Sequence, residues 1–483
     1  MKKNLLFLVV PLLLSGCSNG PDNVTPTGTS TEDCLITNDT TINFLCMADS
    51  DYHDSLQAMI DSFVEIEPHV KVNLYNPLGS GNYSAIERIV VSGFFKEDYP
   101  DLVQCYPDNV VKYIARGYAL NVDDYLNNPV YGLGNDRDDY VASFLEEGSK
   151  YPVSGTYSLP FCKSTELLYY NADVLLGLDL SAVDVSINNG NPLTAAYLDD
   201  LTWEELFDKL CPALFTYNAG LDDKHKIFVD SADTGLFTYD SDENFFITLA
   251  HQYEYGFTHI DENGKGVIDF NNDNMKALLK KMHQAKENRY LQTRGTYHDY
   301  VSSLFTARKS LFTISSTAGL AYNYSKKDPF VIGAANIPHP EGKAGSSINQ
   351  GPSVCVLDHH DEDRALASFL LWKHITNKAN SSAWSLETGY MVVRNSSYDT
   401  PEYQAALVYD DNASKYDISK ANNLLKLKDA KENTFNTSVF RGSSNARTNV
   451  GKLLKDILLQ DGQDETIENL FNFYAEDAEK YIK

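Results

Sequence analysis

The sequence predicts an α/β fold with a parallel sheet, because strand-like runs are separated by segments of helical periodicity. Residues 41–47 (TINFLCM) are mostly apolar and have the length of a buried strand. Residues 70–74 (VKVNL) alternate between apolar and polar side chains as a second strand, and residues 101–105 (DLVQC) are a third. Alternating strands and helices are typical of parallel sheets, in which ligands bind beyond the carboxyl ends of the strands.

Helices are predicted between these strands from apolar residues that recur on one helical face. The first helix is expected from Leu56, Met59, Ile60, Phe63 and Val64. Pro68 ends it, because proline has no N–H to continue the hydrogen-bond ladder. The second helix carries Ile86, Ile89 and Val90, and a long later helix is predicted from about residue 362 to 373.

The middle and the tail of the chain carry weaker signals. Residues 202–205 (TWEE) fit a capping box that opens a helix, and residues 261–269 (DENGKGVID) have the polar glycine turn of a hairpin. This turn resembles a calcium loop only faintly, since Lys265 and Asn272 stand where such a loop needs oxygen ligands. No metal site is expected there. A last helix is predicted over residues 450–458.

Composition limits the classes of function. The chain has 483 residues, enough for about two to three domains, and carries 67 acidic against 40 basic residues for a formal charge of -27. This charge has the wrong sign for a phosphate-backbone binder, so nucleic acid is not expected as a partner. Seven cysteines without metal-ligand spacing predict neither a disulfide scaffold nor a zinc site.

The first residues predict export. Two lysines precede an apolar run over residues 5–14, which is too short for a bilayer that needs about 20 apolar residues and fits a secretory signal. Residues 14–17 (LSGC) resemble the bacterial lipobox, in which the leader is cut before the cysteine and that cysteine is acylated. We therefore expect a lipoprotein signal peptide over residues 1–16, and a lipidated Cys17 that begins a flexible tether over residues 17–35.

An exported enzyme would need a recognisable catalytic arrangement. The sequence has no H-E-x-x-H, G-x-S-x-G, Walker A or G-x-G-x-x-G motif, so neither a catalytic site nor a cofactor is predicted. Adjacent acidic residues are frequent, as chance alone predicts for 67 acids, and they favour a solvated surface. Because two carboxylates that face each other across a cleft leave no sequence signature, an exported glycan-processing enzyme stays open as an alternative.

Several segments resemble a known family when they are taken together. They are the tethered lipobox, YPDLVQCYPDNV (99–110), SSTAG (315–319) and WSLETGYMVVR (384–394). From the signal to about residue 400, the chain resembles extracellular solute-binding lipoproteins of ABC importers, in the carbohydrate-binding family related to maltose-binding protein. The resemblance implies a two-lobed, periplasmic-binding-protein-like (type II) α/β fold, with a hinge and a ligand cleft between the lobes.

The resemblance also implies that both lobes are discontinuous in sequence. The first lobe is expected over residues 36–155 and is completed by about 350–382. The second lobe is expected over residues 156–349 and is completed by about 383–483. The crossings between the lobes are then expected at two places, near residues 154–160 and near residues 348–355.

Family position further implies which residues reach the ligand. The ligand-binding residues expected in this way are Tyr83, Tyr106, Asp108, Lys163, Ser164, Thr165, Ser316, Thr317, Asn349, Gln350, Trp384 and Tyr390. Trp384 and the tyrosines would stack on sugar rings, and the polar members would hydrogen-bond hydroxyls. The chain departs from maltose-type relatives in lacking a tryptophan near residues 315–319 and in an apparent insertion at residues 178–200.

The resulting hypothesis is a lipid-anchored receptor on the extracytoplasmic face of the cell membrane. It captures a carbohydrate, an oligosaccharide, by lobe closure and delivers it to the permease of an ABC transporter. It is expected to act as a monomer without catalysis, cofactor or metal. A further alternative keeps the transport role but replaces the sugar by a peptide, a polyamine or a metal complex, and a cleft lined by carboxylates rather than aromatics would favour it.

Overall fold

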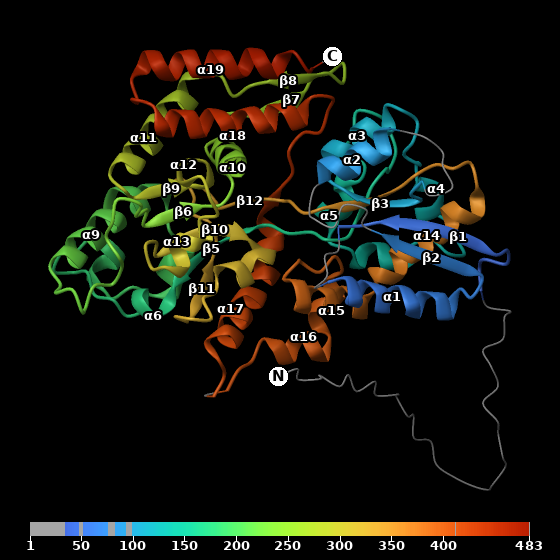
Figure 1. The fold of residues 1–483 in the computed structure, drawn as a ribbon, viewed down its shortest axis with the longest axis horizontal. Coiled ribbons are helices and arrows are strands. Elements are labelled where there is room, and N and C mark those ends of the chain that lie inside the picture. The colour runs from blue at the N-terminus through green and yellow to red at the C-terminus, as the bar shows by residue number, and fades with distance from the viewer. Residues whose placement is uncertain (1–33, 48–51, 76–82, 93–98, 411, 483) are drawn as a thin grey trace, which may run out of the picture.

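The computed structural model describes residues 34–47, 52–75, 83–92, 99–410 and 412–482. These residues form two α/β lobes that lie side by side and are joined by several connecting segments (Figure 1). The expected signal peptide, Cys17 and the tether up to residue 33 lie outside the described residues. Among the helices within the described ranges, none has both the length and the apolar composition that crossing a membrane requires.

The first lobe is built on a five-stranded sheet in the order β2-β1-β3-β13-β4. Its strands are β1 (Thr40–Leu45), β2 (Val70–Tyr75), β3 (Leu102–Cys105), β4 (Leu159–Pro160) and β13 (Ser353–Val356). β1 pairs in parallel with β2 and with β3, which confirms the predicted strand–helix–strand pattern. β13 arrives from a distant part of the chain and runs antiparallel between β3 and β4.

Helices cover both faces of the first sheet. They are α1 (His53–Ile66), α2 (Tyr83–Val91), α3 (Pro107–Ile114), α4 (Asp123–Leu126), α5 (Ala142–Glu147), α14 (Glu362–Ile375), α15 (Lys378–Thr388) and α16 (Pro401–Ala406). α1 and α14 pack on one face and α2 and α3 on the other. The apolar side of α1 is buried at Leu56, Met59, Ile60 and Phe63, as its periodicity predicts.

The second lobe has its own five-stranded sheet, in the order β11-β5-β10-β6-β9. Its strands are β5 (Glu166–Asn171), β6 (Phe237–Tyr239), β9 (Leu291–Thr293), β10 (Phe312–Ser316) and β11 (Ile332–Ala335). β6 pairs in parallel with β9 and β10, whereas β5 is antiparallel to both of its neighbours. The α/β class predicted from the sequence therefore holds for both lobes.

Helices of varied length surround the second sheet. They are α6 (Ala172–Leu175), α7 (Ala195–Asp199), α8 (Trp203–Glu205), α9 (Cys211–Ala219), α10 (Asp242–Gln252), α11 (Asp273–Glu287), α12 (Arg294–Tyr297), α13 (Ser302–Thr306), α18 (Ser443–Leu459) and α19 (Asp464–Glu479). The predicted cap at Thr202 is present, since its hydroxyl accepts a hydrogen bond from the Glu205 amide at 3.0 Å. The predicted hairpin consists of β7 (Thr258–Ile260) and β8 (Gly266–Ile268).

Short 3-10 helices lie at Gly134–Asp139, Ile187–Gly190, Thr317–Asn323, Asn395–Asp399 and Lys431–Asn433, and a π turn at Leu206–Leu210. The residues expected to form an insertion, 178–200, pack against the second lobe through Leu180, Ile187, Leu193 and Leu198. The insertion is therefore part of the second core.

Within the described residues, the chain crosses between the lobes three times. The first crossing joins β4 to β5 over residues 161–165, and the second joins β12 (Ser347–Ile348) to β13 over residues 349–352. The third returns through α17 (Lys415–Ala430) and β14 (Thr434–Phe435) to α18. β12 and β14 pair in parallel, so two of the crossings are hydrogen-bonded to each other at the hinge.

The expected division returns the chain to the second lobe near residue 383, but the third crossing lies further along the chain. Residues 383–483 were assigned to the second lobe in the expected division, but Trp384, Val392, Tyr398 and Tyr403 are buried in the core beneath the first sheet. α17 contacts both lobes, since Leu424 and Leu427 join that core while its Ala430 packs against β5 side chains of the second lobe. Among the described residues after 383, only α18 and α19 belong wholly to the second lobe.

Candidate ligand-binding cleft

Two adjoining cavities lie between the lobes. The larger has a volume of about 640 Å³, and we call it the aromatic cavity after Tyr52, Tyr83, Tyr300, Tyr322, Trp384 and Tyr390 in its walls. The smaller has a volume of about 430 Å³, and we call it the polar cavity after Tyr106, Asp108, Glu166, Asn349, Gln350 and Arg447 in its walls. Tyr83, Asp240 and Ser316 line both, so the two cavities form one continuous cleft. Small-molecule sites typically occupy roughly 300–1,000 Å³.

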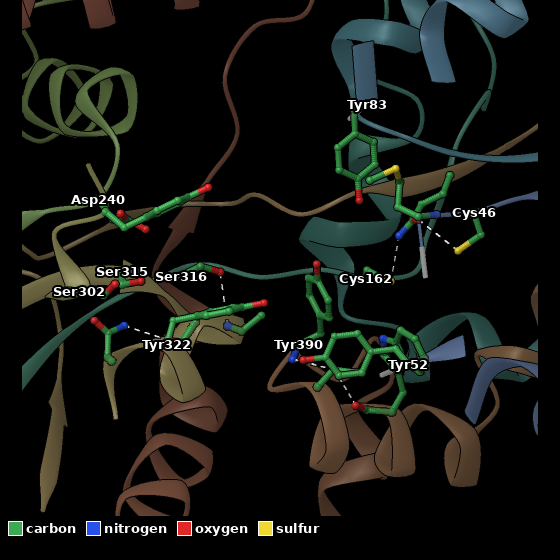
Figure 2. Close-up of a pocket in the computed structure, with 18 residues that line it drawn as sticks. Cys46, Tyr52, Tyr83, Cys162, Asp240, Ser302, Ser315, Ser316, Tyr322 and Tyr390 are labelled. Atoms are coloured by element: carbon green, nitrogen blue, oxygen red, sulfur yellow. Dashed lines mark hydrogen bonds between the residues drawn. The ribbon is translucent and has the colours of Figure 1, made fainter. Parts of the chain in front are cut away.

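Aromatic side chains of the first lobe form one wall of the aromatic cavity. Tyr52 directly precedes α1, Tyr83 begins α2, and Tyr390 follows α15. Gly389 ends α15 at a φ of 76°, a left-handed conformation that glycine adopts without strain, and turns the chain toward Tyr390. Figure 2 shows Tyr52, Tyr83 and Tyr390 on one side of the gap.

Two tyrosines of the second lobe face this wall. Tyr322 lies in the 3-10 helix that follows β10, and Tyr300 lies just before α13. Their side chains are 70% and 56% exposed, which is high for rings of this size. In Figure 2 the Tyr322 side chain reaches across the gap toward Tyr390 and Tyr52. Exposed rings on one lobe therefore oppose an aromatic wall on the other.

Trp384 is the largest ring of the aromatic cavity and also a core residue. It is only 4% exposed, and it stacks on Phe161 with ring centroids 5.4 Å apart and meets Tyr52 edge-on at 6.1 Å. Thr388, one turn later in α15, donates a hydrogen bond to its carbonyl oxygen at 2.6 Å. Trp384 therefore forms the floor of the cavity, whereas Tyr322 and Tyr300 project into it.

Asp240 stands where the two cavities meet. It follows the carboxyl end of β6, the position at which α/β sheets place ligand-binding groups. Its Oδ1 atom is buried and has no hydrogen-bond partner among the described residues. Burial raises the pKa of Asp240 to about 6, with Glu243 and Asp242 acting in the same direction and Arg294 opposing them. Asp240 thus lines both cavities with one carboxyl oxygen that has no donor among the described residues.

Glu166 is a second carboxyl group of the cleft, at the start of β5. It accepts hydrogen bonds from the Tyr239 hydroxyl and, at 2.6 Å, from the Asn244 amide. Burial raises the pKa of Glu166 to about 7, although these two hydrogen bonds and Arg447 oppose the shift. Glu166 thus changes charge near neutral pH beside the hinge.

This titration predicts a pH dependence of stability. Because the folded-state pKa lies above the ordinary value of 4.5, the folded protein holds a proton between about pH 4.5 and 7 that the unfolded chain has lost. The contribution of Glu166 to the free energy of unfolding therefore falls as pH rises through this window. We expect the difference in free energy of unfolding, Glu166→Gln minus wild type, to increase by about 2–3 kcal/mol when the pH is raised from 5 to 8. Urea unfolding at both pH values measures this, and a constant difference would contradict it.

Eight of the residues expected from family position line the cleft. Those in the aromatic cavity are Tyr83, Ser316, Trp384 and Tyr390, and those in the polar cavity are Tyr83, Tyr106, Asp108, Ser316, Asn349 and Gln350. Tyr83 and Tyr106 contact each other edge-on with centroids 4.7 Å apart. Burial raises the pKa of both phenols, so each stays neutral and can donate a hydrogen bond.

The other four expected residues, Lys163, Ser164, Thr165 and Thr317, line neither cavity. Lys163 is fully buried, where its Nζ lies 2.6 Å from Glu147 and 3.1 Å from the Gly351 carbonyl oxygen. Ser164 exchanges two backbone hydrogen bonds with Gln350, at 2.8 and 2.9 Å. These side chains and backbone groups hold the first two crossings together, so they build the hinge.

Sequence reasoning did not select several residues that line the cleft, notably Tyr52, Asp240, Tyr300 and Tyr322. Asp240 could have been found from its place directly after a strand-like run, since ligands bind beyond strand ends. Tyr322 lies just beyond the SSTAG segment at residues 315–319, so a wider window around that motif would have included it. Tyr52 and Tyr300 carry no such signal.

Residues 81–408 match the model of the family described as bacterial extracellular solute-binding protein, which is more than half of the chain. The chain belongs to this family. The match contains every residue of the aromatic cavity named above except Tyr52. No curated protein matches this solute-binding protein in sequence.

Solved structures show the same two-lobed fold. UgpB from Mycobacterium tuberculosis, in complex with glycerophosphocholine, is 17% identical with a TM-score of 0.69, covering 91% of this chain and 98% of that one. The GacH receptor of Streptomyces glaucescens is 16% identical, with a TM-score of 0.62 and coverage of 92% and 99%. The cyclic alpha-maltosyl-1,6-maltose binding protein of Arthrobacter globiformis is 14% identical, with a TM-score of 0.65 and coverage of 91% and 98%. The solute-binding protein thus has the type II fold.

Proposed function

We propose that this solute-binding protein captures a carbohydrate, an oligosaccharide, between its lobes and delivers it to the permease of an ABC transporter. The observation that carries the proposal is the pair of opposed aromatic walls, with Tyr322 and Tyr300 exposed on one lobe and Tyr52, Tyr83 and Tyr390 on the other. Flat rings bearing a hydroxyl match a sugar, which offers C–H groups on its faces and hydroxyls at its edges. The aromatic walls favour a sugar, whereas the carboxyl groups in the polar cavity, among them Asp108, Glu166 and Asp240, are the feature that would favour a polyamine or a peptide.

Capture would proceed by closure of the lobes about the hinge. Each aromatic wall belongs to a different lobe, so a ring placed between them gains contacts from both only when the lobes approach. The observed affinity then equals the closed-state affinity reduced by the cost of shifting from open to closed. Ligand binding and lobe closure are therefore expected to be a single coupled event.

The ligands of structural relatives support a sugar but include another solute. The GacH structures contain acarbose, and the Arthrobacter protein binds cyclic alpha-maltosyl-1,6-maltose, whereas UgpB holds glycerophosphocholine. The lipobox at residues 14–17 supports anchoring through an acylated Cys17, and the family supports an extracytoplasmic location. The proposal includes a monomeric, non-enzymatic receptor without a cofactor.

A thermal-shift panel tests the proposal. The chain from Ser18 to Lys483 is heated with mono- and oligosaccharides, peptides and polyamines, because a ligand at a hundred times its dissociation constant adds about 2.7 kcal/mol of stability. We expect a glycan to raise Tm, and Tyr322→Ala to lower its affinity about tenfold or more without changing the Tm of the free protein. Tyr409→Ala serves as the control, since Tyr409 is exposed and lines neither cavity.

Two outcomes would contradict the proposal. Stabilisation by a peptide or a polyamine but by no glycan would contradict the carbohydrate ligand. Only the solute-binding role would then remain. A glycan that is shortened after long incubation with the protein, as seen by chromatography, would favour the glycan-processing enzyme instead. An unchanged glycan that is bound by wild type and the Tyr409 variant, and weakly by the Tyr322 variant, is the expected result.

A further inference from the structure

The first turn of α18 in the second lobe lies against the first turn of α3 in the first lobe. The hydroxyl of Ser443, the first residue of α18, donates a hydrogen bond to Oδ1 of Asp108 in the first turn of α3. Burial raises the pKa of Tyr106, the residue before α3, and the positive charge of Arg447 in α18 opposes this rise. Two helices from different lobes therefore meet at their N-terminal ends.

α18 begins without a capping side chain of its own. Its N-cap residue is Gly442, at a φ of 105°, and its first turn contains no acidic residue. Glycine is required at this position, because a Cβ atom would lie 2.9 Å from the carbonyl oxygen of Tyr481. The N-terminal end of a helix carries a partial positive charge, so two such ends repel each other and a carboxylate between them is stabilising. Asp108 supplies this carboxylate to α18 from the other lobe.

The chain reaches α18 along the surface of the first lobe. Val439 is 6% exposed and packs in one cluster with Val110 and Val111 of α3. From Gly442 onward, α18 runs into the second lobe, where it packs on α10, α11, α12 and α19. The angle at which α18 leaves α3 therefore fixes how this part of the second lobe faces the first.

We propose that Asp108 is a positioning residue, which caps α18 from the first lobe and forms with Ser443 an interlobe latch at the polar end of the cleft. The latch stabilises the arrangement in which both lobes contact a ligand, and it is lost when the lobes separate. This inference rests on capture by lobe closure, as in the proposed function. It gives Asp108 a role in closure, whereas family position implies a hydrogen bond from Asp108 to a sugar hydroxyl.

Small-angle X-ray scattering of the ligand-free chain from Ser18 to Lys483 tests the latch. Ser443→Ala removes the donor, and Asp108→Asn removes the charge while keeping the size of the side chain. Both variants should have a larger radius of gyration than wild type. Thr448→Ala, which removes an exposed hydroxyl of the same helix, and Asp124→Asn, which removes an exposed acid in the first turn of α4, are the matched controls and should scatter as wild type does.

Isothermal titration calorimetry with maltose and maltotriose measures the effect of the latch on capture. Ser443 lines neither cavity, so its substitution removes no contact with a ligand. Because the closed fraction enters each apparent affinity in the same way, Ser443→Ala should weaken both probes by one common factor, about fivefold or more. If Asp108 bonded a sugar hydroxyl instead, Asp108→Asn would weaken binding while Ser443→Ala left it unchanged, and the latch would be overturned.

An exchange of the two side chains distinguishes a latch from damage to the fold. Asp108→Ser combined with Ser443→Asp places the acid on α18 and the donor on α3, and should restore both the radius of gyration and the affinity. Unchanged scattering of Ser443→Ala, or an exchanged protein as open as Ser443→Ala, would overturn the latch and leave the proposed function intact. If neither maltose nor maltotriose binds, the scattering alone decides the latch, and the wider glycan panel decides the proposed function.

Discussion

Replacement of Trp384 by alanine is expected to lower the free energy of unfolding by about 3–5 kcal/mol, the range for a large aromatic truncated in a core. The indole is 4% exposed and packs on Phe161 and Tyr52. Its removal would leave a cavity beneath the aromatic wall, because these two neighbours belong to separate segments of the chain and cannot both move inward. Urea unfolding followed by circular dichroism measures the loss.

The binding role of Trp384 therefore has to be tested with a milder variant. Trp384→Phe keeps an aromatic ring against Phe161 and is expected to retain most of the lost stability, which leaves a folded protein for ligand titration. Tyr322→Ala provides the opposite case, since its exposed ring contributes little to the fold. If Trp384→Ala unfolded at the same urea concentration as wild type, the indole would not be the core residue that its burial indicates.

Lys163→Met is expected to cost about 3–5 kcal/mol of stability, the range for removing one partner of a buried ion pair. Its ammonium is fully buried against the Glu147 carboxylate and the Gly351 carbonyl oxygen. Glu147 also accepts hydrogen bonds from Asn349 and Ser353, both at 3.3 Å, so the loss of Lys163 would leave its charge uncompensated at the hinge. Thermal and urea unfolding both report the effect.

A double variant and a nearby surface pair control this experiment. Adding Glu147→Gln to Lys163→Met removes the orphaned charge and should restore part of the stability. Lys150→Met breaks the exposed pair of Lys150 with Glu146, 3.4 Å apart and next to the buried pair in sequence, and should cost only about 0–1 kcal/mol. Equal losses for the buried and the exposed lysine would contradict the assignment of Lys163 to the hinge. If the Lys163→Met protein were fully stable but no longer bound its ligand, Lys163 would have to be assigned to the binding site instead of the hinge.

Local periodicity predicted the elements of the first lobe well. β1, α1, β2, α2 and β3 follow one another as the apolar patterns indicate, because the period of a helix or a strand is written in neighbouring residues. The tail was predicted less completely: α18 was expected, but α17 and α19 were not. The apolar residues of α17 are spread among many polar ones and are buried against both lobes, so no single strongly apolar face marks that helix.

By itself, the sequence determined the α/β class, the resemblance to solute-binding proteins and the abundance of aromatic side chains, and the export signal stays a prediction from it. These properties depend on residues that are close together in the chain or on composition alone. The family match over residues 81–408 has the same origin, since its motifs are contiguous segments.

Only the tertiary structure decided which side chains face the gap between the lobes. Tyr52, Asp240 and Tyr322 meet at one cleft although long stretches of chain separate them, and no local pattern encodes such a meeting. The same holds for Lys163, whose partners Glu147 and Gly351 lie 16 and 188 residues away and bury it in the hinge. Burial and pairing are properties of contacts between distant segments, so a residue type that suits a ligand is available to it only when the fold leaves that residue unpaired.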